Sequence, residues 1–72
     1  MKIVSGATAS DGRHISVELE ESDIEGDLPA NVAAKHKKMM QVADILVVKY
    51  FVDAEIFTKE YGQQRMKEIQ SR

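Results

Sequence analysis

The stretch from Val42 to Val52 constrains the fold most, because it is apolar on nearly every side. It reads Val-Ala-Asp-Ile-Leu-Val-Val-Lys-Tyr-Phe-Val. On a helix, at roughly 100° per residue, these side chains leave almost no polar face, which is typical of a helix that is covered on two sides. The rest of a 72-residue chain can cover one of them. We therefore expect a partner to cover the other.

The length and composition lead to the same expectation. A single domain of 72 residues buries only about 60% of the surface that its unfolded chain exposes, so its stability is marginal. The chain has no cysteine, which excludes disulfides, thiolate zinc sites and a thiol nucleophile. Its two histidines are far apart in sequence, so we expect no metal site. Oligomerisation is the remaining common way to stabilise so small a domain.

Residues 2–21 are expected to form a β-hairpin. Asp11-Gly12 is typical of a two-residue type I′ turn, in which both central residues have positive φ. That turn predicts three facing pairs, which together make one apolar face: Thr8 with Ile15, Gly6 with Val17, and Val4 with Leu19. The opposite face is then polar apart from Ile3, and it comprises Ile3, Ser5, Ala7, Ala9, His14, Ser16, Glu18 and Glu20.

A long helix is expected over residues 29–54, after an acidic connector at residues 22–28. Pro29 is well suited to the first helical position. A broad core stripe recurs at helical spacing: Val32, His36, Met39, Ala43, Leu46, Tyr50 and Ala54. A second apolar stripe lies on the far side of the helix. With the neighbouring Phe51, it is the predicted oligomer contact, formed by Ile45, Val48, Phe51 and Val52.

A short second helix is expected over residues 58–70, because Thr58 is a good N-cap and is followed at helical spacing by Tyr61, by Arg65 or Met66, and by Ile69. The alternative is one uninterrupted helix over residues 29–70. The fold class predicted is therefore α+β and oligomeric: an N-terminal β-hairpin packed on a long amphipathic helix and followed by a short C-terminal helix, in the order ββαα.

The last third of the chain resembles a known helical hairpin. Residues 50–69 contain the segment Ile56-Phe57-Thr58-Lys59-Glu60-Tyr61, which is similar to the SHOCT (short C-terminal domain) family. There an apolar residue before Thr introduces an acidic and aromatic start of the second helix. The usual Gly before the Ile-Thr pair is absent, with Glu55 in that neighbourhood. The resemblance implies a role in oligomerisation.

No residue pattern indicates catalysis or a cofactor. His14 is expected in solvent after the hairpin turn, and His36 at the edge of the core. The sequence has no His-x-x-x-His motif, nucleophile elbow, phosphate-binding glycine loop or calcium loop. We therefore expect no enzyme activity, no catalytic or metal-binding residue and no cofactor.

Charge suggests two kinds of partner. An acidic face could occupy a basic groove on another protein, as in small inhibitors or accessory proteins encoded by phages or mobile elements; its residues are Glu18, Glu20, Glu21, Asp23 and Glu25. An alternative is a dimer that binds nucleic acid through Lys35, Lys37 and Lys38, although no aromatic residue is interleaved to stack on bases.

A third possibility is a small-molecule site at the subunit interface, lined by Tyr50, Phe51, Phe57 and Tyr61.

The sequence shows no sign of secretion or of a membrane span. The beginning of the chain has no apolar run of signal-peptide length, and no segment approaches the roughly 20 apolar residues of a membrane span. We expect a cytoplasmic protein that has no membrane partner. The sequence thus predicts a non-enzymatic protein-binding module whose partners are a second copy of itself and another protein.

Overall fold

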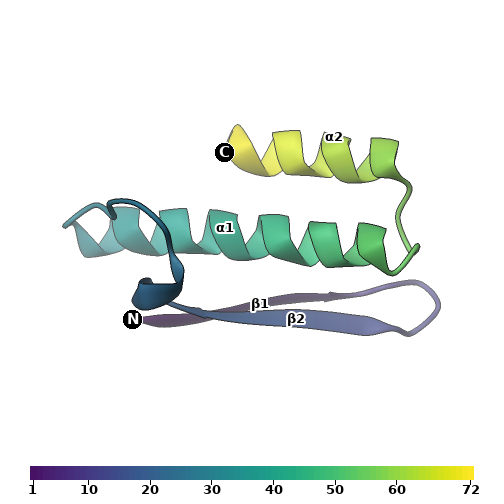
Figure 1. Cartoon of the computed structure of the whole chain (residues 1–72), viewed down its shortest axis with the longest axis horizontal. Coiled ribbons are helices and arrows are strands. Elements are labelled where there is room, and N and C mark those ends of the chain that lie inside the picture. The colour runs from purple at the N-terminus through teal and green to yellow at the C-terminus, as the bar shows by residue number, and fades with distance from the viewer.

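The computed structural model describes all residues from 1 to 72 and consists of a β-hairpin followed by two helices (Figure 1). The strands are β1 (Lys2–Thr8) and β2 (His14–Glu20), and a short 3-10 helix, η1, spans Glu21–Asp23. The helices are α1 (Val32–Asp53) and α2 (Lys59–Gln70). The predicted α+β class and the ββαα order are confirmed. In Figure 1, α1 lies between the hairpin and α2, so it has neighbours on two sides.

The hairpin loop is one residue longer than the sequence suggested. The Ala9 N–H donates to the Arg13 carbonyl at 2.8 Å, and the Gly12 N–H donates to the Ala9 carbonyl at 3.0 Å. Residues 10–12 therefore form a three-residue loop, with Gly12 in the left-handed region at φ +91°, as in a turn that ends in a G1 bulge. The prediction of a two-residue turn is wrong.

This change shifts the strand register by one residue. Ile3 now faces Leu19, Ser5 faces Val17 and Ala7 faces Ile15. A one-residue slip exchanges the two faces of a strand, so Ile3 is buried and Val4 is exposed, the reverse of the expectation. The observed register removes the misfit at Ile3, which the predicted pairing left on the polar face.

The core lies between the hairpin and α1. Four α1 residues at a spacing of four line it, namely Met39, Ala43, Val47 and Phe51, opposite Ile3, Val17 and Leu19. The predicted stripe was thus rotated around the helix: Tyr50 is 45% exposed, Val32 is 65% exposed and His36 is also exposed. The seven-residue strands span about 23 Å and α1, with 22 residues, about 33 Å, so the hairpin cannot cover the whole helix.

The helix α1 begins three residues later than expected. Asn31 is its N-cap, and the Asn31 side chain accepts a hydrogen bond from the Ala34 N–H at 3.0 Å. Pro29 therefore lies before the helix rather than at its first position. An Asn side chain satisfies one of the free N–H groups at a helix start, which explains why the helix begins after this residue.

The chain turns back sharply between α1 and α2. Glu55 adopts a positive φ of 61°, and the N–H groups of Ile56 and Phe57 both donate to the Phe51 carbonyl, at 2.9 and 3.2 Å. The Thr58 side chain then caps α2 by accepting from the Tyr61 N–H at 3.1 Å. The predicted second helix with its Thr58 cap is confirmed, and the single uninterrupted helix is excluded.

Neither helix is long and apolar enough to cross a membrane.

Candidate protein-interaction site

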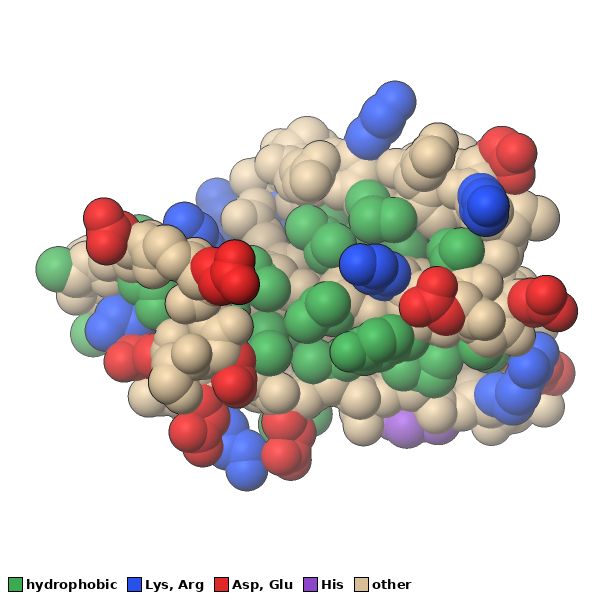
Figure 2. Space-filling view, viewed as in Figure 1, with side chains coloured by type: hydrophobic (Ala, Val, Ile, Leu, Met, Phe, Trp, Pro, Cys, Tyr) green, Lys and Arg blue, Asp and Glu red, His purple; other side chains and the backbone are tan.

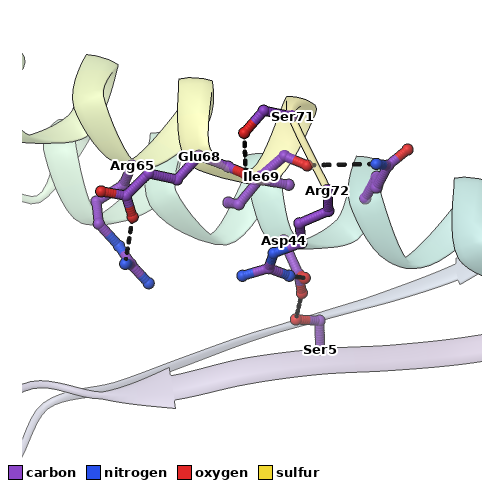
Figure 3. Close-up of polar contacts among 8 residues, drawn as sticks. Ser5, Asp44, Arg65, Glu68, Ile69, Ser71 and Arg72 are labelled. Carbon is purple, nitrogen blue, oxygen red and sulfur yellow. Dashed lines mark hydrogen bonds and ion pairs between the residues drawn. The ribbon is translucent and has the colours of Figure 1, made fainter.

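One side of α1 is closed by the chain itself. Asp44, midway along α1, accepts a hydrogen bond from the Ser5 hydroxyl on β1 and another from Arg72, just after α2, at 3.0 Å (Figure 3). On the same side, the Gln41 amide donates to the Ile69 carbonyl of α2 at 3.3 Å. We call this side, marked by Gln41, Asp44 and Val48, the closed flank, because β1 and α2 are both held against it.

A small groove remains on the closed flank between β1 and α2. It has a volume of about 250 Å³, and residues of α1 and α2 form its apolar floor, including Val48, Phe51 and Ile69. Phe57 stacks on Phe51 with ring centroids 4.8 Å apart, and Tyr61 meets Phe57 edge-on at 4.7 Å. The structure thus brings together three of the four aromatic residues suggested for a ligand pocket, and Tyr50 is not among the lining residues. Ligand pockets usually measure about 300–1,000 Å³, so this groove is small for one.

The opposite side of α1 is open. At roughly 100° per residue, Val42, Leu46 and Lys49 lie about 140–160° around α1 from Asp44, and Ile45 lies about 100° from it, at the edge of this side. The three apolar residues remain partly exposed and Lys49 is exposed. Figure 2 shows hydrophobic side chains forming a band along α1 between the hairpin and α2. We call Val42, Ile45, Leu46 and Lys49 the open flank.

The predicted oligomer contact is divided between these two flanks. Val48 is 6% exposed and Phe51 is 1% exposed, so both are already covered within the protomer, and their part in an oligomer contact stays a prediction. Val52 is partly exposed but lies so close to Gly62 of α2 that a Cβ there would come within 2.4 Å of its Cγ2 atom. Ile45 alone of the four lies on the open flank.

Two residues of the open flank, Val42 and Leu46, were not among the predicted contact residues, and both also pack against the core. Leu46 was assigned to the core stripe, and Val42 to neither stripe. Their spacing with Ile45 and Lys49 is visible in the sequence. The sequence does not show which apolar side α2 covers, because that depends on the turn at Glu55.

The acidic segment is partly neutralised by neighbouring cations. Lys35 lies 2.9 Å from the Glu21 carboxylate, and the amino terminus lies 3.7 Å from it. The hydrogen bond from Lys35, with its positive charge, lowers the pKa of Glu21 below the ordinary value of 4.5. Glu18 lies 3.4 Å from Lys2, and the Asp23 carboxylate accepts from the Glu20 N–H at 2.8 Å. Glu20 and Glu25 are exposed and form no ion pair.

The three lysines do not form one patch. Lys35 forms an ion pair with Glu21, and the Lys38 ammonium donates to the Asp27 carbonyl at 3.3 Å. Lys37 lies on another side of the helix, because neighbouring residues diverge by about 100°.

His14 is exposed and forms a hydrogen bond with the Thr8 hydroxyl. No group of three or more His, Cys, Asp or Glu side chains is arranged to hold a metal ion.

Comparison with protein-family models, curated proteins and solved structures gave no significant match. The resemblance of residues 50–69 to the SHOCT helical hairpin therefore stays a prediction. The open flank, which the packing of the chain itself defines, is the candidate interaction site.

Proposed function

We propose that this chain is a non-enzymatic protein-binding module that associates with itself through the open flank of α1. The observation that carries the proposal is that Val42, Ile45 and Leu46 remain partly exposed after both the hairpin and α2 have packed on the helix. Adjacent apolar side chains on a surface are typical of a contact with another protein.

The energetics favour such a contact. Burial of a large aliphatic side chain contributes about 1.5–3 kcal/mol when complete, and each side chain of the open flank still has part of this contribution to gain. The apolar core is small, with nine buried hydrophobic residues. Association would therefore add a useful fraction to the stability of a domain of this size.

The charged surfaces support other functions less well. Binding to a basic protein would require the acidic segment to present free carboxylates, but Glu18 and Glu21 already have cationic neighbours. Binding to nucleic acid would require several lysines on one face, and Lys35, Lys37 and Lys38 are directed to different surroundings.

The molecular mass in solution tests the proposal. Sedimentation equilibrium over a range of concentrations should give a mass above that of the 8.1 kDa protomer, and Ile45→Lys should return the protein to the protomer mass while its helical circular dichroism is unchanged. Val32→Lys is the matched control, because Val32 is an exposed apolar residue of the same helix outside the open flank. The proposal fails if the natural sequence remains a protomer at every concentration.

A further inference from the structure

We propose that the second copy packs its α1 antiparallel on the open flank, with Ile45 and Leu46 of both copies at the two-fold axis and Lys38 of each copy beside Asp53 of the other. The proposal rests on the self-association proposed above and adds the orientation and register of the two helices. The arguments come from symmetry, charge and the space around α1.

Symmetry brings Lys38 and Asp53 together. Lys38 lies 7.5 positions before the point between Ile45 and Leu46, and Asp53 lies 7.5 positions after it, which is about 11 Å on either side at 1.5 Å per residue. A two-fold axis through that point places each residue opposite the other residue type in the second copy. Both residues lie on the same side of α1 as the open flank, because their positions differ from those of Val42 and Lys49 by four residues.

Asp53 is a charge that forms no ion pair in the protomer, although Lys49 lies one turn before it. It is exposed and lies in the last turn of α1, where there is no basic residue. A carboxylate near the C-terminal end of a helix interacts unfavourably with the helix dipole. A lysine from a second copy would offset that cost. Lys38 uses one of its three N–H donors on the Asp27 carbonyl and has two more available.

Other arrangements of the two helices place like charges together. In a parallel pair in register, Lys38 would face its own copy, and so would Lys49. In an antiparallel pair shifted by four residues toward the N-terminus, Lys38 would face Lys49. Like charges at an interface disfavour the arrangement that brings them together. The proposed register instead sets Lys49 against Val42 of the second copy, where its aliphatic stem covers an apolar side chain and its ammonium group reaches solvent.

Space also favours the open flank over the groove. A helix with its side chains is about 10–12 Å across, and on the closed flank Asp44 already joins β1 to the end of α2. On the open-flank side, the connector between η1 and α1 crosses only the N-terminal part of the helix (Figure 1), where Lys38 donates to the Asp27 carbonyl. Beyond it the hydrophobic band lies at the surface (Figure 2). A second α1 on the open flank would therefore not need to displace α2.

Charge reversal tests the register. We expect Lys38→Glu and Asp53→Lys each to raise the dissociation constant of the dimer about tenfold, because two pairs per dimer change from attraction to repulsion. The double variant should recover most of the affinity. Lys37→Glu is the matched control: it makes the same change of charge on the same helix, away from the open flank, and should leave the dissociation constant within about twofold.

Single cysteines give an independent test, because the natural chain has none. Oxidised Leu46→Cys should give a disulfide-linked dimer, whereas Lys38→Cys should not, since the two copies of residue 38 would lie about 22 Å apart along the axis and a disulfide requires Cα atoms about 4.4–6.8 Å apart. The register is overturned if Lys38→Cys forms the disulfide-linked dimer, or if the double charge variant dimerises no more tightly than the single variants. The proposed function would still stand in that case if Ile45→Lys dissociates the dimer. A natural sequence that never dimerises overturns both.

Discussion

The two flanks of α1 are similar in sequence but differ in how far the rest of the chain buries them. The closed flank contains Val48 and Asp44, and the open flank contains Ile45 and Lys49, so each combines an aliphatic residue with a charged one. On the closed flank the chain buries the valine beneath α2 and gives the carboxylate two hydrogen-bond donors. On the open flank the isoleucine stays partly exposed and the lysine forms no ion pair. The comparison teaches that the apolar residues of a helix show which sides must be buried. The path of the rest of the chain decides whether the same molecule or a partner buries each side.

Lysine substitutions on the two flanks should have the largest and most contrasting effects. Val48→Lys places a charge beneath α2 and should cost about 4 kcal/mol or more of unfolding free energy, enough to unfold much of a small domain. Ile45→Lys replaces a side chain that is only partly buried in the protomer and should cost less, about 1 kcal/mol. Urea unfolding at low protein concentration measures both. Equal losses at the two positions would show that the flanks are not different.

Gly62→Ala should weaken the cover of the closed flank. The added Cβ would lie 2.4 Å from the Val52 Cγ2 atom, an overpacking that typically costs about 1–3 kcal/mol. The higher helix propensity of alanine returns up to about 1 kcal/mol, so we expect a net loss of about 1–2 kcal/mol by urea unfolding. Gln63→Ala, at the next and exposed position of α2, is the control and should be neutral. A stabilised Gly62→Ala would mean that α2 lies farther from α1.

Thr58→Ala should loosen the same cover from the start of α2. The Thr58 hydroxyl accepts the Tyr61 N–H, and loss of such a cap costs about 1 kcal/mol. Hydrogen exchange should accelerate in α2 and leave the hairpin amides unchanged. Thr58→Ser keeps the acceptor and should exchange like the natural chain. Uniform acceleration throughout the protein would show that α2 does not open separately from the rest.

The smallest effect is expected at the ion pair between Lys35 and Glu21, near the start of α1. Because Lys35 lowers the pKa of Glu21, the folded state binds a proton at Glu21 less tightly than the unfolded state does. The pair therefore stabilises the fold above the ordinary pKa of 4.5, and this contribution is lost as the pH falls through the lowered value. In Lys35→Met, the carboxyl resonance of Glu21 should titrate closer to pH 4.5. An unchanged titration would show that Lys35 is not the cause.

The strands and helices were predicted from the sequence more accurately than the sides of them that are buried. The Thr58 cap and the order of strands and helices follow from local signals, and they are present in the structure. The hairpin register was missed because Asp11-Gly12 suits a two-residue turn and a three-residue loop equally well, and only the burial of Ile3 distinguishes them. The division of the second apolar stripe was missed for a different reason. Burial of Val48 depends on the close approach of Gly62 to Val52, a contact between residues that the turn at Glu55 brings together.

Amide NMR spectra recorded across a dilution series test the central claim most directly. If the open flank is the contact surface, the resonances of Val42, Ile45, Leu46 and Lys49 should move with protein concentration, while those of Ser5 and Ala7 beside the groove stay fixed. Spectra that do not change with concentration, or changes confined to β1 and α2, would contradict the account.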